Sequence, residues 1–296
     1  MPLLKVNNRN NDSDGPVEIA EGVYWVGGSG EQGGLRCNSY LIVEGEEAMV
    51  IDAGSRADFP SVMLKILQCS VTPSSLKTYV FHHYTPDTCG SISNFEDIIG
   101  RSDLKIISDK ANHPFISHYS VSSKLLTLEE VNNQFTFSSG RKIIFIKTPY
   151  AHSRGSFISF DQQTGVLFTS DLFGDDSTRW ELFAALSPEC SLCENPDNCP
   201  VTDPKCPLPG ILEYHKRIIP SLKALKYALE EITKIPFSII APQHGGIIRK
   251  PDDILLIFKK LSAMKEVGVD TIVKDKVGSG DIDLVPLLKR LKQHEN

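Results

Sequence analysis

Four apolar runs of this sequence are followed by histidine and aspartate, the residue types that commonly bind metal ions in proteins. If these runs are neighbouring strands, their carboxyl ends place imidazoles and carboxylates around one point at a sheet edge. Mixed nitrogen and oxygen donors suit zinc or non-haem iron, and one shared carboxylate can bridge two cations and offset their repulsion. The run TYVF leads into His82, His83 and Asp87, FIKTP into His152, LFTS into Asp171 and IIAP into His244. This recurrence predicts a metal-binding active site, and the remaining histidines (His113, His118, His215 and His294) receive no role.

The elements that must position these side chains alternate between strands and helices. Strands are expected at 23–27, 38–43, 48–54, 76–83, 104–108, 142–149, 156–160, 165–171 and 237–242. Helices are expected at 58–70, near 109–118, at 212–233 and at 252–267. Two runs of strands, each followed by helices, predict an α/β sandwich of two facing mixed sheets with helices outside. We expect a polar N-terminal tail at 1–16, one domain at 17–267 and a C-terminal tail at 268–296.

Composition limits the partners of this domain. The 296 residues carry a formal net charge of −6, so the average surface repels nucleic acid and anionic lipid headgroups. The N-terminus lacks the apolar stretch of a signal peptide, and no run approaches the roughly 18 apolar residues of a membrane-spanning helix. We therefore expect a cytoplasmic protein with neither a nucleic-acid nor a membrane partner.

Four of the seven cysteines cluster in an aperiodic stretch, 186–210, that interrupts the strand pattern like an inserted loop. Since structural disulfides are rare in the cytosol, clustered cysteines there favour metal or redox chemistry. Four thiolates can close a tetrahedral zinc site or hold an iron–sulfur cluster, and oxidisable thiols are the remaining alternative. The four are Cys190, Cys193, Cys199 and Cys206.

Four segments together resemble the metallo-β-lactamase superfamily, and within it the flavodiiron and oxygen-binding diiron proteins. They are FHHYTPDTCGS (81–91), TPYAHSRGS (148–156), LFTSDLFG (167–174) and APQHG (241–245), and NSYLIVEGEEAMVIDAG matches the N-terminal hairpin of that family. The resemblance covers residues 17–265 and implies the αββα metallo-β-lactamase-like sandwich. It implies that His83 and His152 bind one metal, that Asp87 and His244 bind a second, and that Asp171 bridges them.

Two positions depart from the family pattern. Thr85 stands where a glutamate or second histidine ligand would be, and Thr88 stands where the next histidine would be. A threonine hydroxyl is a weak ligand, so metal affinity should fall and open coordination positions should increase. The nearby side chains that offer compensating donors are His82, Tyr84 and Cys89. We favour His82 as a structural or outer-sphere residue, because it would point to the opposite face of a strand from His83.

The resemblance implies a non-haem diiron protein, with two iron atoms or one, that binds O2 or NO as a sensor or a reductase. A sensor would act on a signalling partner. A reductase would receive electrons through the cysteine loop or from an external donor, because no FMN-binding flavodoxin domain follows within these residues. The alternative is a zinc-dependent hydrolase of esters, thioesters or lactams, in which Asp87 orients the attacking water or takes its proton. No catalytic residue is assigned in the first case, and a homodimer is left open.

Overall fold

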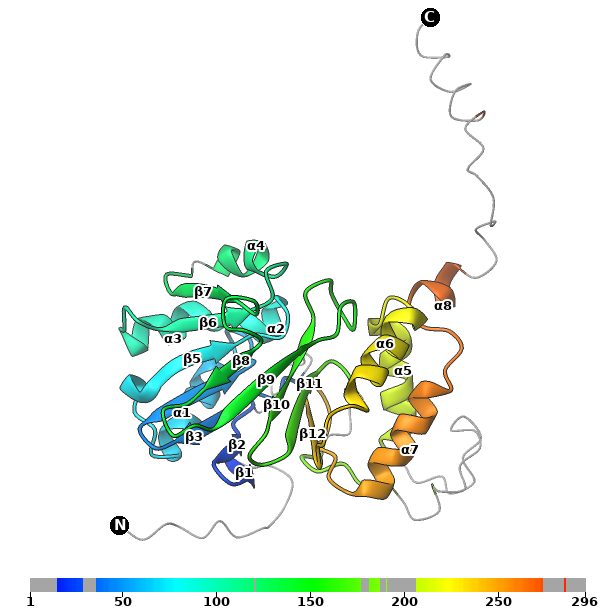
Figure 1. Ribbon diagram of the computed structural model, residues 1–296, viewed down its shortest axis with the longest axis horizontal. Helices are drawn as coiled ribbons and strands as arrows, with labels where there is room; N and C mark the ends of the chain where they lie inside the picture. Colours follow the sequence, from blue (N-terminus) through cyan, green and yellow to red (C-terminus); the bar gives the residue numbers. More distant parts are fainter. Residues whose placement is uncertain are drawn as a thin grey trace, which may run out of the picture.

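The structure is a computed structural model that describes residues 15–28, 36–119, 121–176, 181–186, 190, 206–273 and 285. Two β-sheets face one another, and helices cover the outer face of each (Figure 1). The predicted αββα sandwich of two mixed sheets is therefore confirmed. No helix within the described residues is long and apolar enough to cross a membrane.

The first sheet has seven strands in the order of the chain. It begins as an antiparallel meander and continues as parallel strands, because helical connections return the chain to the same edge before each later strand. The strands are β1 (Val17–Ala20), β2 (Val23–Trp25), β3 (Tyr40–Glu44), β4 (Glu47–Ile51), β5 (Leu76–Val80), β6 (Lys105–Ser108) and β7 (Lys124–Thr127).

The second sheet has five strands in the order β12-β11-β10-β9-β8. Its strands pair antiparallel except for β12, which runs parallel to β11. They are β8 (Gln134–Thr136), β9 (Lys142–Lys147), β10 (Phe157–Asp161), β11 (Val166–Ser170) and β12 (Ile239–Pro242). The parallel pair places the carboxyl ends of β11 and β12 side by side.

Helices α1 and α3 pack their apolar faces on the first sheet, and α5, α6 and α7 pack on the second. Short helical turns fill the connections. The helices are α1 (Phe59–Gln68), α2 (Pro86–Cys89), α3 (Ile92–Ile99), α4 (His113–Ile116), α5 (Leu208–Ile218), α6 (Leu222–Ile232), α7 (Pro251–Ser262) and α8 (Val269–Val273), with 3-10 turns η1 (Pro73–Ser75) and η2 (Ser117–Tyr119).

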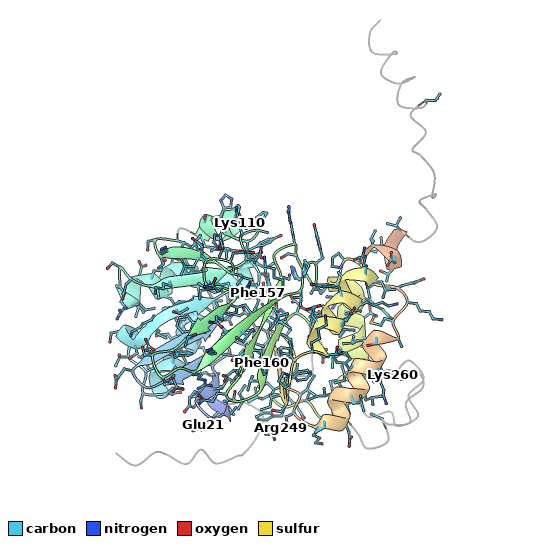
Figure 2. All side chains as sticks on the ribbon, in the orientation of Figure 1. Glu21, Lys110, Phe157, Phe160, Arg249 and Lys260 are labelled. Carbon is cyan, nitrogen blue, oxygen red and sulfur yellow. The ribbon has the colours of Figure 1, made fainter. Side chains whose placement is uncertain are left out.

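Strand β10 lies at the centre of the sandwich and is buried on both faces. Phe157 belongs to the core between the two sheets, whereas Phe160 belongs to the core between the second sheet and helices α5 to α7 (Figure 2). This alternation follows the two-residue period of a strand. The site-bearing loops thus rest on strands that are packed from both sides.

Several predicted elements end at other residues in the structure or divide into shorter elements. The single helix expected at 212–233 is two helices, because Pro220 restricts Ile219 to an extended conformation and Ser221 then caps α6 through Ala224 N, 3.2 Å from its Oγ. Helix α5 also begins at Leu208, within the predicted inserted loop. The strand expected at 76–83 ends at Val80, and the helix expected near 109–118 is only α4 followed by η2.

Candidate metal centre

The predicted ligands follow strands of both sheets. His83 and Asp87 follow β5, His152 follows β9, Asp171 directly follows β11, and His244 follows β12. Because β5 belongs to the first sheet and the other strands to the second, the site forms where the two layers meet. His83, Asp171 and His244 are each at most 2% exposed, so their polar atoms are removed from bulk water.

Three of these side chains form a compact donor group. One ligand atom from each of His83, His152 and Asp171 lies within 4.8 Å of the others. The two imidazole rings are parallel, with centroids 4.6 Å apart, and Asp171 Oδ2 lies 3.2 Å from His83 Nε2. His152 Nδ1 and Asp171 Oδ2 are buried and have no hydrogen-bond partner. Buried polar atoms without hydrogen-bond partners are costly, so this group fits a site that a bound cation completes.

Asp171 directs its two carboxylate oxygens to different histidines. Oδ2 faces His83, whereas Oδ1 lies 3.6 Å from His244 Nε2, and Asp87 Oδ2 lies 3.2 Å from that same nitrogen. His244 Nδ1 is 2.7 Å from the carbonyl oxygen of Arg36. In the tautomer with the proton on Nδ1, this nitrogen donates to the carbonyl and Nε2 has a lone pair for a metal. His83 and His244 thus approach different oxygens of Asp171, and Asp87 reaches the group through His244.

The charges of the group are strongly coupled. Burial opposes ionisation of Asp171, but His83, His152 and His244 hold the pKa of its carboxyl well below the usual range. Burial likewise lowers the pKa of His83, yet the Asp171 carboxylate outweighs it and the pKa rises to about 9. Burial also lowers the pKa of the His152 imidazole. A pair of carboxylates that stays ionised among imidazoles is the electrostatic environment that a divalent cation requires.

The two threonines at the departing positions both contact His83. Thr85 Oγ1 lies 2.8 Å from Nδ1, on the ring edge away from the nitrogen that faces Asp171. Thr88 Oγ1 lies 3.2 Å from Nε2 of the same ring. Thr85 is therefore placed to orient the imidazole, as a hydrogen-bond partner behind a metal-binding histidine does.

The three compensating donors considered from the sequence make their contacts elsewhere. His82 is fully buried, with Nδ1 2.6 Å from Asp52 Oδ2 and Nε2 2.8 Å from Ser159 Oγ. The ring of Tyr84 stacks on Phe115 at 4.1 Å, and the Cys89 thiol donates to the carbonyl of His83 at 3.3 Å.

Two further residues reach the site that sequence reasoning did not select. The Tyr214 hydroxyl of α5 donates to Asp171 Oδ1 at 2.5 Å, and burial raises the pKa of that phenol well above its usual value. Gln243 places its amide between His83, 2.5 Å away, and Asp87, 3.0 Å away. The only available signal for Gln243 was its position directly before His244.

Backbone strain concentrates at this edge of the sheets. Asp52, Tyr150, Ser170 and Phe173 are not glycines, yet their φ angles are 52°, 62°, 54° and 65°. Such left-handed conformations cost roughly 1 kcal/mol or more each and persist where the surroundings enforce them. Ser170 and Phe173 flank Asp171, so the strained turn sets the direction of its carboxylate.

His215 of α5 holds this turn from behind. Its Nε2 accepts from Phe173 N at 3.0 Å, and its Nδ1 donates to the carbonyl of Ile211 at 2.7 Å. Both ring nitrogens of His215 are therefore hydrogen-bonded. Burial lowers its pKa to about 4.

A pH-dependent loss of stability follows for His215. In the unfolded chain His215 is protonated below its ordinary pKa of 6.5, whereas in the folded chain it is protonated only below about pH 4. The free energy of unfolding should therefore fall by up to about 3 kcal/mol between these values. The measurement is urea unfolding of metal-free protein across this range, compared with His215→Gln, which keeps an acceptor for Phe173 N but does not titrate. Equal slopes in both proteins would contradict the assignment.

The cysteine loop is described only near its ends. Cys190 is buried, and its Sγ lies 3.8 Å from Sγ of Cys206 at the start of α5. Cys193 and Cys199 lie outside the described residues.

Known proteins with this fold include diiron proteins. One solved structure, described as a peroxy diiron species of the chemotaxis sensor ODP, has a TM-score of 0.66 and 22% identity, over 84% of this chain and 93% of that chain. The rubredoxin oxygen:oxidoreductase of Desulfovibrio gigas has a TM-score of 0.66 and 20% identity, over 83% of this chain and 60% of that chain. Similarity at this level of identity establishes the fold.

The chain is also similar in sequence to parts of longer curated proteins. The anaerobic nitric oxide reductase flavorubredoxin of Vibrio vulnificus is 23% identical over 220 residues, 73% of this chain and 41% of that protein. The chain spans between 24% and 56% of the lengths of three other curated relatives that it matches. The similarity therefore concerns one part of these longer proteins.

The family assignment rests on a longer match. A family model described as ODP family beta lactamase matches residues 35–245, a range that contains all five predicted ligands. The resemblance to the metallo-β-lactamase superfamily is thereby confirmed. Because the match covers more than half of the 296 residues, the chain belongs to the ODP beta-lactamase family.

Proposed function

We propose that this chain is a non-haem diiron protein that binds O2 or NO, as a sensor or as a reductase with an external electron donor. The observation that carries the proposal is the group of His83, His152 and Asp171, in which the buried His152 Nδ1 has no hydrogen-bond partner. Two histidines and one carboxylate on one side of a cation are the donor set of non-haem iron(II) sites with open positions. Bound ferrous iron would supply the electron density that binds a diatomic gas.

The residues of the chain have separate tasks in this centre. Asp171 holds the two positions together through its two oxygens, and Tyr214 fixes the plane of that carboxylate. Asp87 and His244 complete the second position. Burial of His83 and His244 limits the access of competing water. The similar proteins support this assignment, since they include a diiron sensor, an oxygen oxidoreductase and a nitric oxide reductase.

The hydrolase alternative requires Asp87 to act as a general base, and its pKa bears on that role. A general base for water works best with a pKa near neutrality. Burial raises the pKa of Asp87, but His244 and His83 outweigh it and lower the value to about 2. A carboxylate held this acidic stays ionised, which suits a cation ligand better than a general base.

We also propose that the cysteine loop binds a metal of its own, as zinc or as an iron–sulfur cluster. Support comes from Cys190 and Cys206, whose sulfur atoms are 3.8 Å apart. Two thiolates bound tetrahedrally at about 2.3 Å to one metal lie at about this separation. Either centre would adjoin α5, the helix that carries Tyr214, and an iron–sulfur cluster there would be able to pass electrons to iron held by Asp171.

The test is metal and acid-labile sulfide analysis of anaerobically purified protein, with visible spectra before and after O2 is admitted. We expect iron, close to two atoms per chain at this site, and a spectral change on oxygenation. His152→Ala should lose both, whereas His118→Ala, at an exposed histidine outside the site, should keep them. Colourless protein that contains only zinc would favour the hydrolase instead. Sulfide that disappears in Cys190→Ser would place the cluster on the cysteine loop.

A further inference from the structure

Gln243 lies between His83 and Asp87 and is not among the five predicted ligands. Its side chain is 1% exposed. The amide oxygen Oε1 lies 2.5 Å from His83 Nε2. The amide nitrogen donates to Asp87 Oδ2 at 3.0 Å and to Thr88 Oγ1 at 2.7 Å. Both polar atoms of a buried amide are thus directed at residues of the metal site.

The orientation of this amide is determined by its neighbours. The Asp87 carboxylate only accepts hydrogen bonds when it is ionised, so the NH2 end of Gln243 must face it. The oxygen must then face His83 Nε2, the nitrogen that also lies 3.2 Å from Asp171 Oδ2. Oε1 therefore directs its lone pairs toward the donor group of His83, His152 and Asp171.

We propose that Gln243 Oε1 is a further donor to the cation held by His83, His152 and Asp171. This inference rests on the proposed function, because it requires a cation at that position. Adjacent ligand atoms about 2.1 Å from one cation lie about 3 Å apart. The separations of His83 Nε2 from Gln243 Oε1 and from Asp171 Oδ2, 2.5 and 3.2 Å, bracket this value.

Gln243 would thereby replace the donor that is missing at Thr85. The Thr85 hydroxyl contacts His83 Nδ1, on the other edge of the ring, so it does not occupy the vacated position. Thr88 takes a hydrogen bond from the Gln243 amide nitrogen and so helps to hold Oε1 in place. Thr85, Thr88 and Gln243 then belong to one arrangement. In it, the Gln243 amide oxygen supplies the metal donor that a side chain at position 85 would otherwise supply.

The replacement changes the charge of the site. A carboxylate donor contributes a negative charge to the metal, whereas an amide contributes none. Removing one anion from a buried site costs the ferric state more stabilisation than it costs the ferrous state. We therefore expect iron at this position to have a higher reduction potential than it would have with a carboxylate in place of Gln243, which favours reversible binding of a gas over rapid turnover.

The test uses Co2+ as a spectroscopic probe of the metal-free full chain. Visible ligand-field bands report the number and type of donors, and competition with a chelator gives the affinity. Gln243→Met keeps a similar volume but removes both polar atoms, and we expect a loss of at least tenfold in Co2+ affinity with a changed spectrum. Gln68→Met, the same exchange at an exposed glutamine of α1, is the matched control and should keep the wild-type affinity and band positions.

A second variant keeps the proposal testable if Gln243→Met does not fold. Gln243→Glu restores an anionic oxygen, and we expect a shifted Co2+ spectrum and a lower reduction potential of bound iron. Unchanged spectrum and potential in Gln243→Glu, or unchanged or tighter Co2+ binding by Gln243→Met, would overturn the role of Gln243. A wild-type protein that binds neither Co2+ nor Fe2+ would instead overturn the proposed function, so the two failures are distinguishable.

Discussion

Replacing Asp171 by asparagine is expected to abolish binding of the metal pair, with a loss of more than about 100-fold in affinity for the first cation. Loss of an outer partner of a ligand already costs about 10- to 100-fold, and Asp171 faces both positions directly. Asparagine keeps the shape and an oxygen for the Tyr214 hydroxyl. The variant therefore removes the charge that offsets the repulsion between two divalent cations, while the fold around it stays intact.

The measurement is metal content per chain together with calorimetric titration of the metal-free protein. Asp252→Asn, at an exposed carboxylate in the first turn of α7, is the matched control and should bind as the wild type does. Two metals per chain in Asp171→Asn would contradict the bridging role. One tightly bound metal would mean that His83 and His152 suffice for the first position.

The positions of the predicted ligands could be read from the sequence because each follows an apolar strand. Val166–Ser170 and Ile239–Pro242 are short, buried and β-branched or aromatic, so the chain must leave the sheet at Asp171 and just before His244. The pattern of a polar metal ligand after a buried run survives errors in strand length. The expected strand at 76–83 extended past Val80, yet His83 still lies at the sheet edge.

Residues that reach the site from other elements carried no such signal. Tyr214 lies in the middle of α5, and only the packing of that helix on the second sheet brings its hydroxyl to Asp171. Gln243 reads as a polar residue in a turn, and its role depends on the distance between His83 and Asp87 in three dimensions. The break between α5 and α6 was different, because Pro220 marks it locally and the helical periodicity on both sides concealed it.

Replacing Arg141 by methionine is expected to lower the free energy of unfolding by about 3 kcal/mol. The guanidinium lies just before β9, 1% exposed, and its Nη2 and Nε donate to the fully buried carboxylate of Asp161 at 2.5 and 3.2 Å. It also reaches Glu44, at the end of β3, at 3.1 Å, so it joins the two sheets. Removing one partner of a buried ion pair leaves an uncompensated charge, which costs about 3–5 kcal/mol.

The lower end of that range applies because Asp161 keeps two other donors, the hydroxyl of Thr164 at 2.5 Å and Gln163 N at 3.2 Å. Chemical unfolding of metal-free protein measures the loss. Arg101→Met is the control, since its pair with Asp103 is exposed to solvent and should contribute far less. Equal effects of the two variants would mean that Arg141 does not join the sheets. Recovery of stability in Arg141→Met combined with Asp161→Leu would show that the cost lies in the buried charge rather than in lost packing.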